Sequence, residues 1–296
     1  AGTAALVALL GAAGLAAVMT FGPYGGFHGH LDKLSFVFFG HRRELGVDPG
    51  RAASQAYRLP IHTGWYKATL GHNAVLVDGQ PQAPAAGELE LFAADGSFAA
   101  AAARCTEAYP KVSHRRLLVL APEYLLVLDE LQAETARRFD WLYHNRARSV
   151  ACEAAAAAGE LDRPFAGREY VGDVRSGRAD GPVRAAFEGE GVTVHLLADA
   201  QKGTKVHTGD GVGASIVDRV PMVVLGRRGK EARFAVVLEP VAGGARPAVE
   251  GVELAQEAPL RVRVRLKDRL DEAVLGDDGL KMFRDGQAVL TASPRR

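Results

Sequence analysis

Residues 117–128 read Leu-Leu-Val-Leu-Ala-Pro-Glu-Tyr-Leu-Leu-Val-Leu, two apolar runs on either side of a short polar interruption. Each run, 117–120 and 124–128, has the length and the Leu/Val composition of a buried strand. The intervening Ala121-Pro122-Glu123 carries a residue that favours turns. This stretch therefore predicts two adjacent antiparallel strands, and the rest of the chain repeats its pattern.

Strand signals also occur in other parts of the chain, from the N-terminal to the C-terminal region. Residues 5–10 and 15–21 are predicted to form two buried strands joined by a Gly-rich turn. Residues 72–77 lead into Asp78-Gly79, a dipeptide that favours hairpins. Residues 260–266 alternate apolar and basic, which predicts a surface strand with its arginines in solvent. The alanine runs at 99–103 and 154–158 are too short for independent helices, so we interpret them as compositional bias.

These patterns predict an all-β fold, a large antiparallel β-sandwich with a smaller C-terminal β unit. No repeat of 20 to 50 residues is visible, which disfavours a propeller or a solenoid. Polar and glycine residues around 199–213 suggest the junction between the two parts. We therefore expect a main sandwich over residues 1–205 and a smaller unit over residues 206–296.

Charge and cysteine content exclude several classes of protein. The chain of 296 residues has 36 Lys plus Arg against 35 Asp plus Glu, so no global basic field predicts a nucleic-acid or membrane partner. Cys105 and Cys152 fit neither a disulfide scaffold nor a cysteine-rich zinc site, and their pairing stays open. The uncharged first 27 residues are interrupted by glycines and Pro23, unlike a signal peptide or a membrane span. The chain begins without Met, as though inside a longer protein.

One stretch carries candidate chemistry: residues 25–33 read Gly-Gly-Phe-His-Gly-His-Leu-Asp-Lys. In an extended chain His28 and His30 point to the same side and could meet one metal or substrate. Asp48 and His72 would complete a set of nitrogen and oxygen donors that suits zinc. Such a wide spacing also arises by chance in a chain with nine histidines, so spacing alone does not decide between the two.

A resemblance to a known family gives these candidate residues a more specific interpretation. Residues 20–146 closely resemble the C-terminal region of the heparinase II/III-like polysaccharide lyases, which include the oligoalginate lyases. The order and the spacing of five sequence blocks carry the resemblance: residues 26–35, 43–50, 64–66, 70–79 and 139–145.

The resemblance implies β-elimination of uronic-acid polymers, of alginate or heparin/heparan type. It implies that His30, Asp48 and His72 bind a structural zinc while His28 faces the substrate and transfers the proton. Tyr66 is a further catalytic candidate for contacting substrate or leaving group, with packing beside Trp65 as the alternative.

The family also carries an N-terminal α-helical toroid, and this sequence contains no such helical array. The resemblance therefore implies two partners, the toroid as a domain or subunit and an acidic polysaccharide or oligosaccharide. An excess of Lys and Arg around residues 33–67 suits an acidic polymer. A periplasmic or secreted location is expected.

Two other readings stay open. A non-catalytic carbohydrate-binding or structural β-sandwich would keep the zinc for stability alone. A cupin-like enzyme would hold a redox metal with open coordination in a shorter barrel. Among the remaining histidines, His144 is expected either at the site or in packing, and the others are expected to be exposed: His41, His62, His114, His195 and His207.

Overall fold

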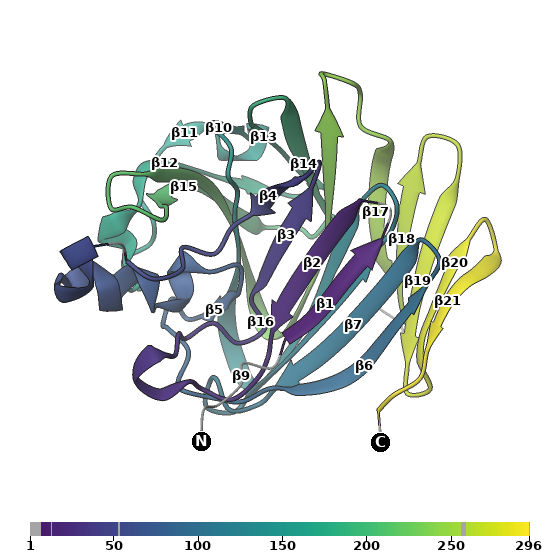
Figure 1. The fold of residues 1–296 in the computed structure, drawn as a ribbon, viewed down its shortest axis with the longest axis horizontal. Coiled ribbons are helices and arrows are strands. Elements are labelled where there is room, and N and C mark those ends of the chain that lie inside the picture. Colours follow the sequence, from purple (N-terminus) through teal and green to yellow (C-terminus); the bar gives the residue numbers. More distant parts are fainter. Residues whose placement is uncertain (1–6, 13, 53, 256–258, 296) are drawn as a thin grey trace.

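The computed structural model describes residues 7–12, 14–52, 54–255 and 259–295, which form three antiparallel sheets (Figure 1). The first has four strands in the order β1 (Val7–Ala12), β2 (Leu15–Thr20), β3 (Phe36–Gly40) and β4 (Arg43–Gly46). The third has five, β17 (Val249–Ala255), β18 (Leu260–Leu266), β19 (Leu270–Gly276), β20 (Gly279–Arg284) and β21 (Gln287–Ala292). The predicted all-β class is therefore confirmed.

The second sheet is the largest, with twelve strands. Its main path is β10 (Ser149–Ala151), β13 (Val183–Glu188), β14 (Val192–Ala198), β16 (Arg219–Ala242), β9 (Leu125–His144), β8 (Val112–Leu120), β7 (Phe98–Cys105) and β6 (Glu88–Asp95). Off this path, β5 (Val75–Val77) pairs with β9, and β15 (Thr204–Val212) pairs with β16 and with β12 (Gly172–Ala179), which also pairs with β11 (Ala157–Ala158).

The described residues contain no α-helix longer than residues 60–61. Their helical segments are turns of three to five residues: η1 (Gly26–His28), η2 (Ser54–Arg58), η3 (His62–Tyr66), η4 (Thr69–Gly71), η5 (Glu153–Ala155) and η6 (Arg168–Tyr170). None of these is long and apolar enough to cross a membrane. Figure 1 shows the turns of residues 54–66 at one side of the molecule and strands β17–β21 at the other.

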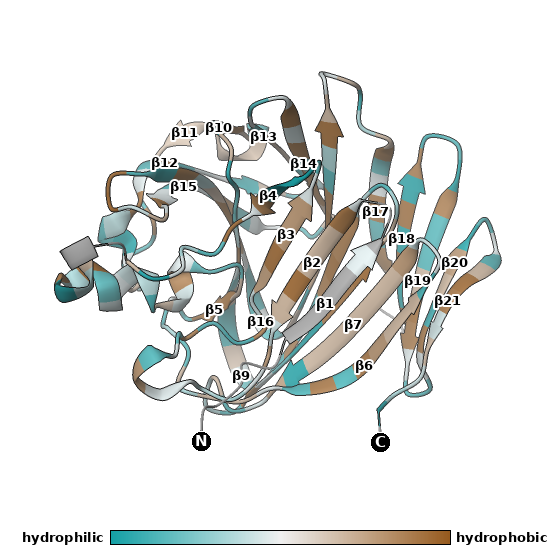
Figure 2. Cartoon of the chain, viewed as in Figure 1, coloured by the Kyte–Doolittle hydropathy of each residue, from teal (hydrophilic) through white to brown (hydrophobic). Residues whose placement is uncertain are grey.

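The large sheet is the middle layer, because both of its faces are buried. On one face Val127 packs in a cluster with Met19 and Phe38 of the four-stranded sheet. On the other face Leu126 and its neighbours pack with the five-stranded sheet. A strand that is buried on both sides has no polar face, which explains why the run at 125–128 does not alternate. Figure 2 shows apolar residues along β2 and β3, which cover one face of this sheet.

The strands predicted around Pro122 are confirmed. Strands β8 and β9 pair antiparallel with Leu117 opposite Leu128 and Leu120 opposite Leu125. The turn closes with a hydrogen bond of 2.9 Å from the Ala121 amide to the Tyr124 carbonyl. The two strands are longer than predicted, because β9 runs on for 20 residues.

Several other predicted elements are also present. Strands β1 and β2 pair antiparallel as expected, although residues 5 and 6 of the first prediction lie outside the described residues. Strand β18 covers 260–266 with its leucines and valines buried and its arginines at least partly exposed. The first alanine run lies in β7, and the second is divided between η5 and β11. Cys105 and Cys152 are both free.

The hairpin predicted after residue 77 is only partly right. Asp78 and Gly79 do turn the chain, with φ angles of 53° and 71°, but the hairpin consists of one bridge between Val77 and Gln80. The strand itself is short, Val75–Val77, and it pairs with β9 instead. Residues 72–74 precede it as irregular chain, because the side chains of His72 and Asn73 have partners elsewhere.

The division into two domains, 1–205 and 206–296, stays a prediction. The boundary between the large sheet and the C-terminal sheet lies at a different position in the chain. Strand β15 begins at Thr204 and pairs with β16, so both belong to the large sheet. The separate five-stranded sheet begins at Val249. The polar stretch at 199–213 is therefore a loop and a strand of the large sheet and lies before the sheet boundary.

Candidate metal centre

The loop that carries His28 and His30 is irregular, which corrects the expectation of an extended segment. Residues Gly26–His28 form the single 3-10 turn η1, and His30 lies in irregular chain after it. A Cβ atom at Gly29 would come within 2.6 Å of the Tyr24 ring and 2.7 Å of the Gly25 nitrogen. The close approach of the chain here therefore requires glycine between the two histidines.

His72 is buried and held in one orientation. It follows turn η4, and its Nδ1 lies 2.8 Å from the carbonyl oxygen of Ala68. A carbonyl oxygen can only accept, so Nδ1 carries the proton and Nε2 keeps a free lone pair. This is the arrangement that orients a histidine for metal binding through Nε2.

Two further donor groups, from His30 and Asp48, lie close to this nitrogen. Nδ1 of His30 lies 3.2 Å from Nε2 of His72, and Oδ2 of Asp48 lies 3.5 Å from the same atom. All three donor atoms lie within 4.8 Å of one another. The other oxygen of Asp48 accepts the Gly50 amide at 2.7 Å, which fixes the carboxylate with Oδ2 towards the histidines. The structure thus brings together the three residues that the sequence grouped as metal ligands.

These residues fit a zinc ion. Zinc–nitrogen bonds of 2.0–2.1 Å in a tetrahedral site place two ligating nitrogens about 3.3 Å apart, close to the observed 3.2 Å. Burial and the neighbouring His72 lower the pKa of His30, which favours the neutral imidazole that a metal needs. Two imidazoles and one carboxylate are also a donor set that zinc prefers.

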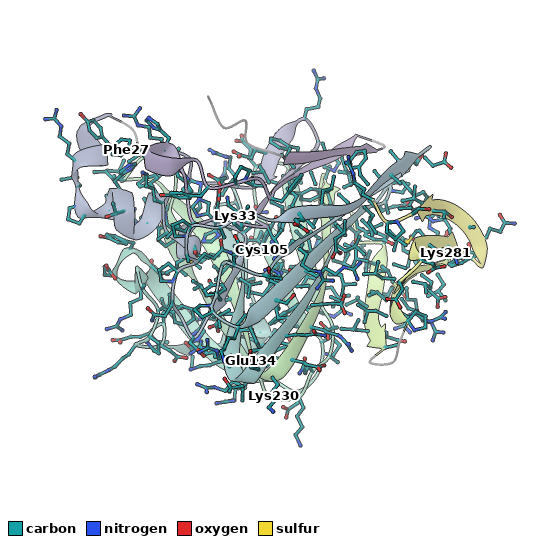
Figure 3. All side chains as sticks on the ribbon, turned by 90° about the horizontal axis from the view of Figure 1, so that it is seen from below. Phe27, Lys33, Cys105, Glu134, Lys230 and Lys281 are labelled. Atoms are coloured by element: carbon teal, nitrogen blue, oxygen red, sulfur yellow. The ribbon has the colours of Figure 1, made fainter. Side chains whose placement is uncertain are left out.

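His28 points to a different environment. Its side chain is exposed, and its ring makes an edge contact with Phe27 at 5.2 Å between centroids. Phe27 is 86% exposed, and the ammonium of Lys67 lies 5.0 Å from its ring centre. Figure 3 shows Phe27 at one end of the molecule, far from Lys281 of the C-terminal sheet. His28 is therefore open to solvent, two positions from the partly buried His30.

Tyr66 is buried in this structure. It ends the π-helical turn η3, and its hydroxyl donates to the Gly213 carbonyl at 3.0 Å. The Trp65 indole donates similarly to the Val212 carbonyl at 2.8 Å. Burial raises the pKa of Tyr66. The packed arrangement is the alternative that the sequence left open, and a contact of Tyr66 with substrate stays a prediction that requires the Gly213 segment to move.

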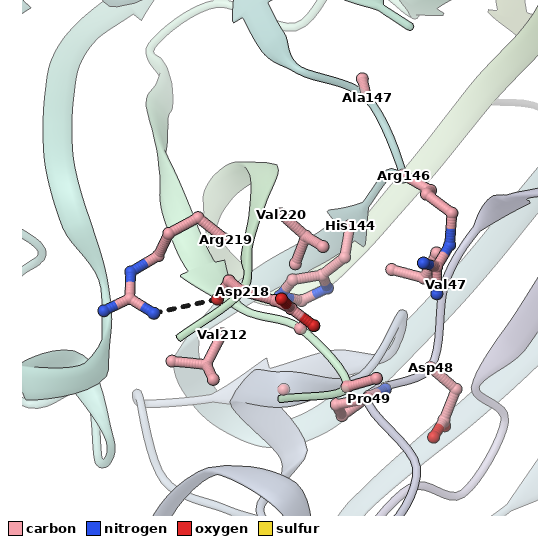
Figure 4. A pocket seen from close by; sticks show the side chains of 13 residues that line it. Val47, Asp48, Pro49, His144, Arg146, Ala147, Val212, Asp218, Arg219 and Val220 are labelled. Carbon is pink, nitrogen blue, oxygen red and sulfur yellow. Dashed lines mark hydrogen bonds between the residues drawn. The ribbon is translucent and has the colours of Figure 1, made fainter. Parts of the chain in front are cut away.

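A pocket of about 240 Å³ opens beside Asp48 (Figure 4). Its wall includes the buried His144, with Arg146 and Arg219 on either side and Asp218 in front. The sequence did not single out Asp218 or Arg219, because the loop between β15 and β16 is distant in sequence from the histidine motif. Neither residue belongs to a recognisable motif.

His144 is linked to the candidate metal centre through Asn73. Its Nδ1 lies 3.2 Å from Oδ1 of Asn73, the residue after His72, while its Nε2 has no partner. The Asn73 amide nitrogen donates to the carbonyls of Phe36 and Val47, so Oδ1 is an acceptor and Nδ1 of His144 carries the proton. Burial, followed by the influence of His72, lowers the pKa of His144 to about 3. A neutral imidazole therefore lines the pocket.

A buried network of charged side chains holds the segments that carry the candidate metal ligands. The Arg116 guanidinium donates to the Leu34 and Asn73 carbonyls at 2.5 and 2.6 Å, so it ties together the chain after His30 and the chain after His72. Its position is fixed by Asp129, whose oxygens lie 2.8 and 3.0 Å from Arg116 nitrogens.

Asp129 has two further partners. His114 Nε2 lies 2.5 Å from one oxygen, and the Trp141 indole donates to the other at 2.9 Å. Both Asp129 and His114 are buried, and so is His207, although the sequence predicted exposed histidines at 114 and 207. The error has a physical origin: Asp129 partners His114, while Ser176 Oγ lies 2.7 Å from His207 Nδ1, and such partners offset the cost of burial.

Comparisons with known proteins identify the family of this chain. The family model for the heparinase II/III-like C-terminal region matches residues 1–233. The chain belongs to this family, and its homologues are polysaccharide lyases. It is 30% identical over 192 residues to the alginate lyase of Stenotrophomonas maltophilia strain K279a, a match that covers 57% of this chain and 26% of that protein.

Solved structures share the fold. The heparinase III BT4657 gene product superposes with a TM-score of 0.63 at 15% identity, over 91% of this chain and 39% of that one. The heparan sulfate lyase HepC from Pedobacter heparinus gives 0.62 at 15% identity, over 98% and 42%. The chain thus spans well under half the length of these relatives.

Proposed function

We propose that this chain is the metal-containing β-sandwich part of a polysaccharide lyase, which cleaves uronic-acid polymers or oligomers by β-elimination. The observation that carries the proposal is the convergence of His30, Asp48 and His72 within 4.8 Å, with the exposed His28 two positions from the first of them. This arrangement separates a group that can hold a metal from a group that can meet a substrate.

The three converging residues would hold a zinc ion. Bound there, zinc would supply a structural cross-link between the His30 loop, the Asp48 turn and the chain at His72. Fixing these segments would also fix the direction of His28, because Gly29 alone separates it from the anchored residue.

The reaction places three demands on the whole protein. The proton on the fifth carbon of the uronic acid must be removed, its bonding electrons form a carbon–carbon double bond, and the bond to the glycosidic oxygen breaks. The leaving oxygen must receive a proton, and the substrate carboxylate must be neutralised so that the first proton becomes acidic. We assign proton transfer to His28, since imidazole accepts and donates protons near neutral pH.

The remaining tasks require the rest of a longer protein. An N-terminal α-toroid, as a domain or as a separate subunit, would neutralise the carboxylate and complete the binding cleft. We keep Tyr66 as a candidate for handling the leaving group in that assembly. A periplasmic or secreted location accompanies this proposal.

The substrate class is an acidic polysaccharide or oligosaccharide. We favour alginate-type oligomers over heparin or heparan sulfate, because the alginate lyase match is supported by 30% sequence identity. The heparan sulfate lyase match at 15% identity supports the fold alone.

The test is the ultraviolet absorbance of the new double bond, measured for the full-length protein on alginate, heparin, heparan sulfate and hyaluronan. His28→Ala should abolish turnover. His41→Asn is the matched control, because His41 is also exposed and its φ of 50° is tolerated by Asn. Saturated products would indicate hydrolysis and contradict the proposal, and full activity of His28→Ala would contradict the role of that residue.

A further inference from the structure

A second pocket, of about 330 Å³, lies on the large sheet away from the metal centre. Its wall comes from β9, β12, β15, β16 and the loop before β15. On β9, Arg138 lies opposite Arg228, while His144 of the first pocket lies opposite Met222. Six residues of strand separate the two positions, or about 20 Å at 3.3 Å per residue. The two pockets are therefore distinct sites.

The second pocket has an excess of positive charge. One carboxylate, Asp162, lines it, against six cationic side chains: Arg138, Arg178, Lys202, Lys205, Arg227 and Arg228. Asp162 pairs with Arg138 and Lys205, and Asp199 behind the wall pairs with Arg227 at 3.0 Å.

Three of the cations keep their charge uncompensated. Arg178, Lys202 and Arg228 are exposed at the pocket, and none of them forms an ion pair within the described part of the chain. Three like charges around one concavity raise the local concentration of anions. They also repel one another, and a bound anion would relieve this repulsion.

The decisive feature is the buried guanidinium of Arg138. Its side chain is only 8% exposed, and its Nε lies 2.8 Å from Asp140 while Nη1 contacts Asp162. Its Nη2 is buried and has no partner among the described residues. A buried donor without an acceptor is unfavourable, so this atom favours a ligand that can accept its hydrogen bond.

Gly226 lies beside that nitrogen. A Cβ atom at this position would lie 3.7 Å from Nη2 of Arg138 and 2.8 Å from Oδ1 of Asp140. Both Gly226 and Arg138 line the pocket. The absence of a side chain at Gly226 therefore leaves no methyl group beside this fixed, charged donor in the pocket wall.

We infer that this pocket binds an oxyanion, the sulfate or carboxylate group of an acidic saccharide. Arg138 supplies the fixed donor, and the three exposed cations supply the surrounding field. A guanidinium held by carboxylates and packed on the Phe165 ring at 4.6 Å is preorganised, so binding costs little side-chain entropy. The oxyanion part of the inference rests on this pocket alone, and the saccharide part rests on the proposed function.

The experiment is isothermal titration of this chain with sodium sulfate, sodium glucuronate and a sulfated uronic disaccharide, with ionic strength held constant by sodium chloride. Neutral maltose is the uncharged control. We expect the free anions and the disaccharide to bind and maltose not to bind. Binding of the free anions without the disaccharide would contradict the saccharide part, and binding of none of them would overturn the inference.

The variants locate the site. Arg138→Lys keeps the charge but removes the guanidinium fork, and it should weaken binding about tenfold. The double variant Arg178→Ala/Arg228→Ala changes only exposed side chains and should weaken it by a similar factor, so it decides the matter if Arg138→Lys misfolds. Arg246→Ala is the matched control, since Arg246 is exposed without an ion pair and lies outside this pocket.

Two further outcomes separate the proposals. His28→Ala should bind sulfate as the wild type does, although it should lose turnover. The proposed function and the anion site can therefore fail separately in these experiments. Undiminished binding in the double variant would overturn the inference. So would tighter binding of a short DNA duplex than of the sulfated saccharide at the same ionic strength.

Discussion

Nδ1 of His30 lies 3.2 Å from Nε2 of His72, although the two residues are 42 positions apart in the chain. Their rings are inclined at 65°, with centroids 5.3 Å apart. The hydrogen bond from His72 Nδ1 to the Ala68 carbonyl leaves the facing Nε2 as an acceptor. Two imidazole nitrogens directed at one point, with a carboxylate beside them, define the geometry on which the first prediction depends.

His30→Ala should lose both metal and stability, because a ligand that binds only the folded state stabilises it. At a free metal concentration a thousand times the dissociation constant, this amounts to about 4 kcal/mol. His28→Ala should keep both, since its side chain is exposed. Elemental analysis and thermal denaturation of the purified variants measure the two effects. A wild-type protein that is equally stable after chelation would contradict a structural metal.

Asp129→Asn should destabilise the fold by about 3–5 kcal/mol, because it leaves the buried Arg116 without its counter-charge. Urea denaturation measures this loss. The adjacent Glu130→Gln is the matched control: Glu130 lies next along β9 and is partly exposed, so its ion pairs should contribute about 1 kcal/mol or less. Equal losses in the two variants would show that the buried network does not carry the stability assigned to it.

Gly71→Ala should disturb the metal centre through the backbone. A Cβ atom there would lie 2.6 Å from the Trp65 carbonyl oxygen, which accepts the Ala68 amide in the turn before His72. We expect a loss of about 1–3 kcal/mol from overpacking, together with reduced metal content. Gly172→Ala meets nothing within 4 Å and should be nearly neutral. A melting temperature unchanged by Gly71→Ala would show that the turn can relax.

His207 should make stability depend on pH. Burial, followed by the charge of Lys205, lowers its pKa to about 4 in the folded protein, against an ordinary value of 6.5. The neutral form is favoured by folding, so this contribution is complete above pH 6.5 and is lost as the pH falls towards 4. His207→Gln does not titrate, and its free energy of unfolding should fall less between pH 7 and pH 5. Urea denaturation at several pH values tests this, and parallel profiles for variant and wild type would refute it.

The local sequence patterns were informative about strands for a physical reason. A run such as residues 125–128 has high β propensity and no polar face, and burial on both sides of a middle sheet is what such a run requires. The turn at residues 121–124 and the surface strand at 260–266 follow equally from local chemistry. The irregular chain at 72–74 did not, because the backbone amides of His72 and Ala74 form local turn bonds to the Thr69 and His72 carbonyls in place of strand pairing.

The grouping of His30, Asp48 and His72 came from order and spacing, and the identity of the family came from the same motif. The sequence by itself thus determined the β class, the family and the set of candidate ligands. Only the tertiary structure decided which groups support them: Arg116 and Asp129 lie on β8 and β9, far from the ligands in sequence, and Arg116 donates to the backbone carbonyls of Leu34 and Asn73, a group that every residue possesses. It also decided the burial of Tyr66 and the pocket around Arg138, because both depend on long-range antiparallel pairing, and a local pattern does not specify which strands meet.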